Sequence, residues 1–316
     1  MRCCVIGGAG FIGRTLVEKL VITGRDVVVV GRHIAPEKAQ SFNVEYVTCN
    51  YANRNQLREV LSTCEEIIDL AYATVPQTSF ADPLFDLQQN LPPVIGLLEE
   101  ARTIDRLRRL VVVSSGGTVY GPVGHLPIVE ETPLSPVSPY GITKMTIEKY
   151  AMMFHRLHGL PITIVRPANA YGVGQKPFTG QGFIATAMGH IVRGDEVIIF
   201  GENGTVRDYV HVTDIARGIV AALGKGECGV AYNIGAGVGR NNREVLDILE
   251  PLALQNGYPI RIRTEPARSF DVPANVLNFD RLLACSGWLP DVSFEEGIDE
   301  MWRQFLNATQ SGSFSI

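Results

Sequence analysis

Short runs of apolar, often β-branched residues alternate with longer amphipathic stretches through the first half of the chain. The short runs predict buried strands, and the longer stretches, with apolar residues at helical spacing, predict helices. The predicted strands are 3–6, 27–30, 44–48, 66–70, 110–114 and 162–166, and the predicted helices are 12–23, 55–62, 86–102 and 140–158. Strands that alternate with helices form a parallel sheet covered on both faces. The pattern therefore predicts an α/β fold with a doubly wound, Rossmann-type sheet.

Two features interrupt this alternation. Pro92 and Pro93 should kink or restart the helix predicted over 86–102, because proline lacks the backbone N–H donor. After about residue 166 the alternation ends, and glycine, proline and aromatic residues crowd the segment 167–182. One βαβ-like unit returns at 208–210, 214–223 and 230–233.

The change in pattern predicts two domains. The first is a dinucleotide-binding domain over 1–165, with about 206–238 returning to it. The second is a smaller, mixed α/β domain that binds the substrate, over about 166–205 and 239–305, followed by a tail over 306–316.

Composition narrows the class of protein. Of the 316 residues, 46% are hydrophobic and 19% charged, which supports a sizeable core. The formal net charge of −5 lacks the basic excess of nucleic-acid-binding proteins. No apolar run reaches the roughly 18 residues of a membrane span, and Met1-Arg2 does not begin a signal peptide. Six cysteines without metal-ligand spacing indicate buried, reduced thiols. We therefore expect a cytoplasmic protein with no metal, nucleic-acid partner or membrane contact.

Three glycines, Gly7, Gly10 and Gly13, lie between the first predicted strand and the first predicted helix. Glycine permits a tight turn and the close approach of backbone to a pyrophosphate, and the last glycine lets the helix pack on the strand. The N–H groups at the start of the helix, near Phe11 and Ile12, can then bind the phosphates. This segment predicts a dinucleotide site.

Gly31 and Arg32 follow the second predicted strand, where NAD-binding proteins carry an acid that binds the adenosine ribose. That acid is missing, and an arginine here can instead bind the 2′-phosphate of NADP. Arg32 could equally stack on the adenine or remain in solvent. We expect NAD as the cofactor, with NADP as the alternative.

Tyr140 and Lys144 open the helix predicted over 140–158 and, at positions i and i+4, share one helical face. A nearby cation favours phenolate and lowers the pKa of a tyrosine from its usual value of about 10. Tyr140 is therefore a candidate general base for a hydroxyl proton. Upstream, the hydroxyl-rich segment 114–121 follows the strand predicted over 110–114, and ligands bind beyond the carboxyl ends of parallel strands.

These segments, in this order, resemble the extended short-chain dehydrogenase/reductase family, and within it the nucleotide-sugar epimerases of the UDP-glucose 4-epimerase type. The resemblance covers nearly the whole chain. The matching segments are GGAGFIG at 7–13, SSGGTVYG at 114–121, YGITK at 140–144, RPANAYG at 166–172, GTVRDYVHVTD at 204–214 and RSFDVP at 268–273.

The resemblance implies roles for individual residues. Tyr140 would be the base, and Lys144 would hold the nicotinamide ribose and lower the pKa of Tyr140. Asn169, Arg207 and Arg268 would bind the nucleotide diphosphate, which an arginine pair can hold with bidentate hydrogen bonds. Further implied contacts are those of Asp271 with the nucleotide ribose and of Asn50, Tyr51, Leu70, Ala71 and Ser114 with the cofactor.

The chain departs from the family pattern at two places. Gly116 stands where relatives usually carry a Ser or Thr whose hydroxyl lies next to the catalytic tyrosine. We expect Thr118 to replace that hydroxyl, with Ser115 as the alternative. The acid that contacts adenine in relatives is also missing near Asn50.

The expected activity is 4-epimerisation of a nucleotide sugar, most simply a UDP-hexose, by transient oxidation at C4. Dehydratase relatives need acidic groups in the segment occupied here by 116–118, which has none. An NADP-dependent reductase of a keto-sugar or other carbonyl compound is the alternative, and a non-catalytic dinucleotide sensor is a third class.

Two further expectations follow from the resemblance. Asn275, four residues beyond Asp271, would line the C2 side of the sugar, where a small amide leaves space for an N-acetyl group; Asn275 could also simply cap a turn. This position predicts that UDP-GlcNAc and UDP-GalNAc are interconverted as well as UDP-Glc and UDP-Gal. The helices predicted over 86–102 and 140–158 would form the seam of a homodimer.

Overall fold

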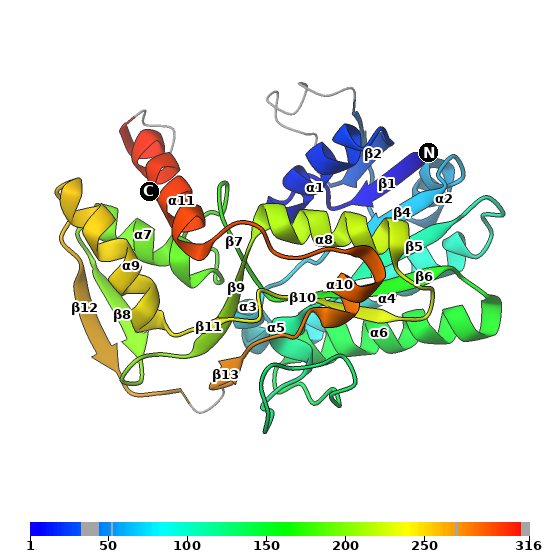
Figure 1. Ribbon diagram of the computed structural model, residues 1–316. Coiled ribbons are helices and arrows are strands. Elements are labelled where there is room, and N and C mark those ends of the chain that lie inside the picture. The colour runs from blue at the N-terminus through cyan, green and yellow to red at the C-terminus, as the bar shows by residue number, and fades with distance from the viewer. Residues whose placement is uncertain (33–43, 52, 269–270, 311–316) are drawn as a thin grey trace.

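The computed structural model describes residues 1–32, 44–51, 53–268 and 271–310. The main sheet contains seven parallel strands in the order β10-β6-β5-β4-β1-β2-β3 (Figure 1). This order confirms the predicted doubly wound sheet. The strands are β1 (Arg2–Ile6), β2 (Asp26–Gly31), β3 (Glu45–Thr48), β4 (Glu66–Asp69), β5 (Arg109–Val113), β6 (Ile162–Pro167) and β10 (Ala231–Ile234).

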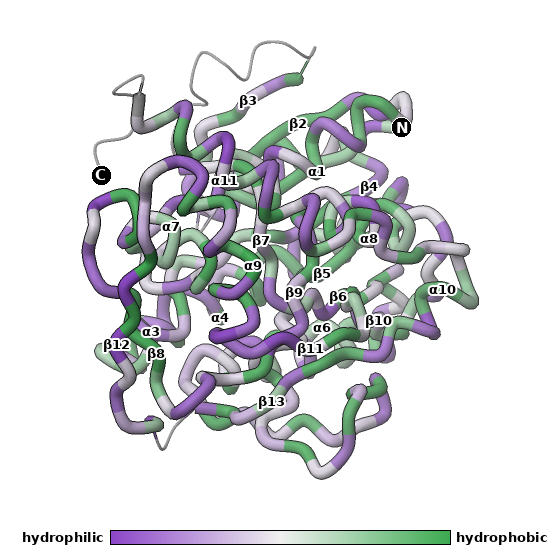
Figure 2. Tube along the Cα trace, turned by 60° about the vertical axis from the view of Figure 1, so that its left-hand side comes forward, coloured by the Kyte–Doolittle hydropathy of each residue, from purple (hydrophilic) through white to green (hydrophobic). Residues whose placement is uncertain are grey.

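Helices cover both faces of this sheet because successive strand residues point to opposite sides. In β1, Cys3 and Val5 pack with α1 (Phe11–Ile22) and α8 (Val212–Lys225), whereas Cys4 and Ile6 pack with the other face. That other face is covered by α2 (Arg54–Leu61), α4 (Pro83–Ala101) and α6 (Pro139–His158). In Figure 2 the strands of the main sheet are mostly green, or hydrophobic, inside this layer of helices.

α4 differs from its prediction, because it runs from Pro83 to Ala101 without restarting at Pro92 and Pro93. The two prolines remove hydrogen bonds to the carbonyls of Gln88 and Gln89. Both glutamines are exposed, so water can bind the carbonyls that are released.

A second lobe lies to the left in Figure 1 and contains two small sheets. One joins β7 (Asn169–Tyr171), β9 (Val206–His211), β11 (Gly239–Arg240) and β13 (Ala274–Asn275), and the other joins β8 (Glu196–Phe200) to β12 (Arg261–Glu265). The apolar core of this lobe comes mainly from α7 (Phe183–Arg193), α9 (Asn242–Gln255) and α11 (Phe294–Gln310). The shorter helices are α3 (Pro76–Ala81), α5 (Gly116–Val119) and α10 (Asp280–Ser286).

Two details differ from the sequence analysis. β9 does not return to the main sheet, since it pairs with β7, β11 and β13; only α8 and β10 return. A short apolar strand of this kind fits either sheet, and only its long-range pairing decides between them. Of the six free cysteines, Cys228 is exposed and Cys285 half-buried, whereas the other four are buried as expected.

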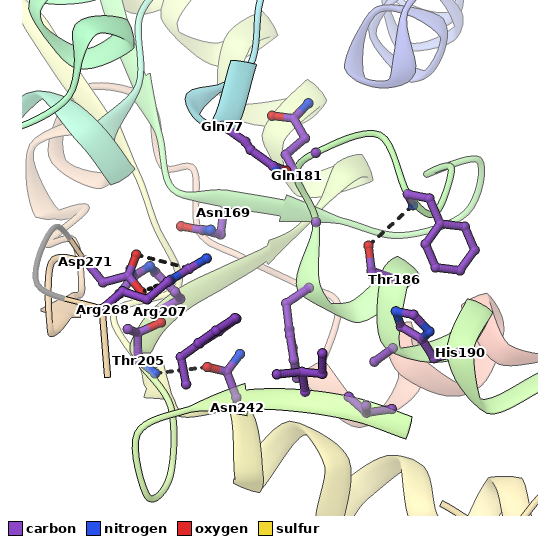
Figure 3. Close-up of a pocket in the computed structure, with 18 of the residues that line it drawn as sticks. Gln77, Asn169, Gln181, Thr186, His190, Thr205, Arg207, Asn242, Arg268 and Asp271 are labelled. Carbon is purple, nitrogen blue, oxygen red and sulfur yellow. Dashed lines mark hydrogen bonds and ion pairs between the residues drawn. The ribbon is translucent and has the colours of Figure 1, made fainter. Parts of the chain in front are cut away.

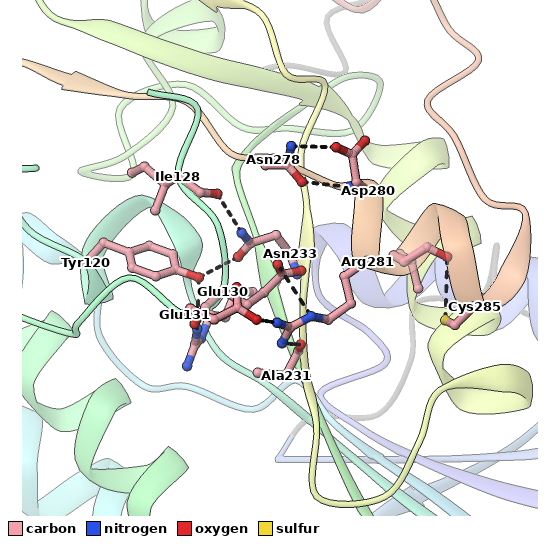
Figure 4. Close-up of polar contacts among 12 residues, drawn as sticks. Tyr120, Ile128, Glu130, Glu131, Ala231, Asn233, Asn278, Asp280, Arg281 and Cys285 are labelled. Atoms are coloured by element: carbon pink, nitrogen blue, oxygen red, sulfur yellow. Dashed lines mark hydrogen bonds and ion pairs between the residues drawn. The ribbon is translucent and has the colours of Figure 1, made fainter. Parts of the chain in front are cut away.

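A buried polar network fastens β6, β10 and α6 together. Arg166 of β6 donates to both carboxylate oxygens of Glu148 on α6, at 3.0 and 2.7 Å. Its Nη1 donates to the Tyr120 hydroxyl at 2.8 Å, and that hydroxyl donates to Asn233 of β10 at 2.7 Å. Figure 4 shows how Asn233 also binds the backbone of Ile128. Every polar group here has a partner, as burial requires.

We predict that Glu148→Ala lowers the free energy of unfolding by about 3–5 kcal/mol, because it leaves the Arg166 guanidinium buried without its carboxylate. Arg166 and Glu148 are only 8% and 3% exposed. Urea unfolding followed by circular dichroism measures the change. Glu99→Ala, which removes the exposed pair with Arg102, is the control and should cost about 0–1 kcal/mol. Equal losses in the two variants would contradict the assignment.

Candidate active site

The turn between β1 and α1 fits a dinucleotide pyrophosphate. Gly7 has φ of +82°, which side chains disfavour, and a Cβ there would lie 3.1 Å from the Ala71 nitrogen. A Cβ on Gly13 would lie 2.5 Å from the Gly7 carbonyl oxygen, so only glycine lets α1 pack this closely on the turn. Gly10 precedes α1, which begins at Phe11 and continues through Ile12, and no side chain caps its N-terminal N–H groups. Those groups can therefore bind phosphate.

The predicted adenosine side of the cofactor site lies at the ends of β2, β3 and β4. Arg32 is exposed just after β2, and the following residues 33–43 lie outside the described part of the chain. Asn50 and Tyr51 follow β3, and the Tyr51 hydroxyl donates to Asp69 at 2.8 Å. Burial raises the pKa of Asp69 to about 6. The other predicted cofactor residues near this edge are Gly31, Leu70 and Ala71.

Tyr140 and Lys144 lie in the first two turns of α6, as predicted. Pro139 is the first residue of this helix, and the Ser138 hydroxyl caps it by accepting from the Gly141 N–H at 3.1 Å. Lys144 is buried, and its Nζ donates to the Val113 carbonyl at the end of β5, at 2.9 Å. This bond fixes the lysine to the carboxyl edge of the sheet.

The electrostatics of the pair differ from the sequence prediction. Burial raises the pKa of Tyr140 above its usual value, the Asp86 carboxylate raises it further, and a hydrogen bond from Ser115 lowers it. The expected lowering by Lys144 is not found, because its Nζ binds Val113 and lies 5.9 Å from the centre of the Tyr140 ring. Burial also lowers the pKa of Lys144 to about 8, although the carboxylates of Asp69, Glu148 and Asp86 raise it.

Three hydroxyls surround this pair. The Ser115 side chain lies close enough to Tyr140 to lower the pKa of its phenol, whereas the hydroxyls of Ser114 and Thr118 are buried without a partner in the described residues. Ser115, the alternative in the sequence analysis, is therefore a candidate together with Thr118 for the hydroxyl next to Tyr140. A Cβ on Gly116 would lie 2.4 Å from Leu277 Cδ1, so a serine could not occupy that position without displacing Leu277.

Two adjoining cavities open beside these residues. The larger, of about 520 Å³, is shown in Figure 3 and lies between β8, α7 and the start of α9. The second, of about 470 Å³, reaches Thr118 and Ser138 near the start of α6. Arg207, Arg268 and Asp271 line both cavities, and Asn169 lines the larger. Residues distant in sequence therefore meet here as predicted.

The two arginines give the junction of the cavities a net positive charge. Arg268 donates to Asp271 at 2.8 and 3.2 Å and lies over the Phe200 ring at 4.1 Å. Arg207 donates to the backbone carbonyls of Val206 and Val272, both at 2.8 Å. Burial lowers the pKa of Arg207, and the Arg268 guanidinium lowers it further, whereas Tyr209 and Asp271 raise it. Two guanidiniums beside a single carboxylate suit an anion.

Asn275 is buried beside Gly116. Its amide donates to the Gly116 carbonyl at 3.0 Å, and it is not among the described residues that line the two cavities. Its role at the C2 side of a sugar stays a prediction.

Several residues of this region were not predicted from the sequence. Asp69 ends β4 and Tyr72 lies three residues beyond it. The position of an acid at the carboxyl end of a buried strand could have revealed Asp69. Thr186, His190 and Asn242 line the larger cavity from distant helices, and no local pattern marks them. The described residues contain no cluster of three or more side chains suited to a metal ion and no helix that could cross a membrane.

Comparisons with known proteins agree with this arrangement. A sequence model of the NAD dependent epimerase/dehydratase family matches residues 3–235. A UDP-glucose 4-epimerase of Mycolicibacterium smegmatis is 33% identical over 317 residues, which cover 98% of this chain and 100% of that protein. The crystal structure of a UDP-glucose 4-epimerase from Thermotoga maritima with UDP-glucose has a TM-score of 0.89 and 31% identity, covering 98% of this chain and 100% of the other. A dTDP-glucose 4,6-dehydratase of Streptomyces venezuelae, crystallised with NAD, reaches a TM-score of 0.89 at 27% identity, covering 100% and 99%.

The family match spans most of the chain and includes both the glycine turn and the Tyr140–Lys144 pair. The resemblance inferred from the sequence is thereby confirmed, and so is NAD as the cofactor. This chain belongs to the NAD dependent epimerase/dehydratase family.

Proposed function

We propose that the protein is a nucleotide-sugar 4-epimerase that interconverts UDP-glucose and UDP-galactose. The observation that carries this proposal is a cavity lined by Ser138, which caps the helix of Tyr140 and Lys144, together with Arg207 and Arg268. A candidate base next to the cavity and a cation pair in its wall match a hexose attached to a diphosphate. The epimerase relatives support the same substrate class.

In this proposal the nucleotide occupies the larger cavity and the sugar the second. The diphosphate binds Arg207 and Arg268, with Asn169 beside them and Asp271 on the nucleotide ribose. Thr118 lines the second cavity, and its buried, unpartnered hydroxyl can bind a hydroxyl of the sugar.

Tyr140 takes the proton from the C4 hydroxyl during oxidation and returns it during reduction. The Ser115 side chain lowers the pKa of the Tyr140 phenol and so favours its charged form. The N–H groups at the start of α1 would hold the pyrophosphate of NAD, and Lys144 and Ser114 would bind its nicotinamide half. NAD supplies a reversible hydride acceptor, so that hydride can leave C4 and return to either face of a 4-keto sugar.

Dehydration and net reduction are the competing reactions. Dehydration requires an acid close to the sugar, whereas 116–118 is Gly-Gly-Thr. An NADP-dependent reductase would exchange its cofactor on every turnover, whereas an epimerase regenerates it. The dehydratase relatives share the fold and the cofactor, so the absence of this acid favours epimerisation.

We also propose a homodimer through α4 and α6. The two helices pack against each other, and each leaves apolar side chains exposed: Leu84 and Leu87 on α4, and Met153 and Leu157 on α6. An exposed apolar surface on two neighbouring helices suits a symmetric interface.

We predict that the purified protein converts UDP-glucose to UDP-galactose with only catalytic NAD present. Anion-exchange chromatography of the nucleotides measures the product, and absorbance of NADH measures any net reduction. A net change in NADH or NADPH proportional to product, or a 4-keto-6-deoxy product, would contradict epimerisation. A panel that includes UDP-GlcNAc tests the wider range.

We predict that Tyr140→Phe lowers kcat by about 10²–10⁴-fold, because only the titrating oxygen is removed. Cofactor binding and the unfolding midpoint should stay close to those of the wild type. If the variant retains more than about a tenth of the wild-type kcat, Tyr140 is not the base.

We predict that the affinity for NADP comes within about tenfold of that for NAD, because Gly31 and Arg32 stand at the end of β2, where an acid would repel a 2′-phosphate. Arg32→Ala should weaken NADP selectively, since it removes a cation placed near that phosphate. Fluorescence titration of both cofactors with both proteins tests this. An equal loss for the two cofactors would mean that Arg32 only stacks on the adenine.

A further inference from the structure

Asp86 is a fully buried carboxylate on α4, close to the proposed catalytic pair. Its oxygens accept hydrogen bonds from three hydroxyls: Thr143 at 2.7 Å, Tyr72 at 3.3 and 3.4 Å, and Thr74. The Asn90 amide also lies within 3.5 Å. Within the described residues no arginine or lysine forms an ion pair with Asp86. Burying a carboxylate without a cation is costly, so the hydrogen bonds to Asp86 must offset that cost.

Hydroxyls and an amide surround the Asp86 carboxylate. Each of these contacts comes from a group that can donate a hydrogen bond, so the carboxylate oxygens have partners although the side chain is buried. Asp86 therefore places a carboxylate with satisfied hydrogen bonds in the layer between α4 and α6.

The Tyr72 ring connects this carboxylate to the catalytic pair. Its hydroxyl donates to Asp86, and its ring lies beneath the Lys144 ammonium, with Nζ 4.2 Å from the ring centre. The same ring packs against Tyr140, with 4.6 Å between ring centres and a tilt of 59°. One aromatic side chain thus contacts both members of the pair and is oriented by Asp86.

Thr143 provides a second connection. It lies between Tyr140 and Lys144 in the sequence, on the first turns of α6, and its hydroxyl donates to Asp86 across the helix interface. The carboxylate therefore fixes both the Tyr72 ring and the segment of α6 that carries the pair.

We propose that Asp86 is a positioning residue, which orients Tyr72 and the start of α6 and acts by its charge on both Tyr140 and Lys144. A negative charge raises the pKa of every neighbouring group. The other groups that face Lys144 are Asp69 from β4 and Glu148 from α6, and Ser115 faces Tyr140 from the loop after β5. All of them remain when Asp86 alone is neutralised.

The direct test is the pKa of Lys144, measured by NMR of protein labelled at the lysine side chains. The signal is assigned by its absence from Lys144→Arg. Lys144 of the wild type should titrate near 8, and Asp86→Asn should lower that value by about 0.5–1 pH unit. Glu100→Gln is the matched control, because Glu100 is a buried carboxylate of the same helix, about 21 Å further along it, and should leave the value unchanged. An unchanged Lys144 pKa in Asp86→Asn would overturn the proposal.

Kinetics supply a second readout, which rests on the proposed epimerase activity, whereas the titration does not. Asp86→Asn should lower kcat about tenfold with KM nearly unchanged and should move the whole pH profile of kcat to lower pH. Tyr72→Phe removes one oxygen, keeps the ring and preserves the fold, so it serves if Asp86→Asn does not fold. It too should lower kcat about tenfold at constant KM, and a wild-type kcat in Tyr72→Phe would overturn the proposal.

Discussion

The seven strands of the main sheet run parallel, so their carboxyl ends lie along one edge, and the candidate site depends on that edge. The glycine turn follows β1, Arg32 follows β2, and Ser114 follows β5. The bond from Lys144 to the Val113 carbonyl ties α6 to the same edge, and Ser138, which caps this helix, lines the second cavity. Without this bond the Lys144 ammonium would be buried and lack its hydrogen-bond acceptor, which is costly. The position of α6 and the environment of Lys144 therefore depend on each other.

Burial determines how this chemistry must work. It opposes the charged forms of both Tyr140 and Lys144, and the neighbouring carboxylates help only the lysine. Lys144 therefore has neighbouring carboxylates that offset its burial, whereas the same kind of charge works against the ionised phenol of Tyr140. Arg207 and Arg268 supply positive charge in the wall of the second cavity, where they could bind a diphosphate.

The sequence predicted the main sheet closely, because buried parallel strands are short, continuous apolar runs and the covering helices are amphipathic. From the sequence, Tyr140, Lys144, Arg207 and Arg268 were expected to lie in one region. The two arginines were predicted from the family resemblance alone. The sequence did not predict the sheet to which β9 belongs, since pairing between distant strands leaves no local pattern. Asp86 was not predicted, and Ser115 was only the alternative to Thr118. Both matter because of contacts with residues of α6, which sequence spacing does not reveal.

In the proposed epimerisation, C4 of the sugar is oxidised and then reduced by the same hydride within one binding event. UDP-glucose carrying deuterium at C4 distinguishes this reaction from dehydration and from net reduction, with the nucleotide products analysed by mass spectrometry and proton NMR. We expect UDP-galactose that retains the deuterium at C4. Deuterium found at C6, lost to solvent or accumulated in free reduced cofactor would contradict it.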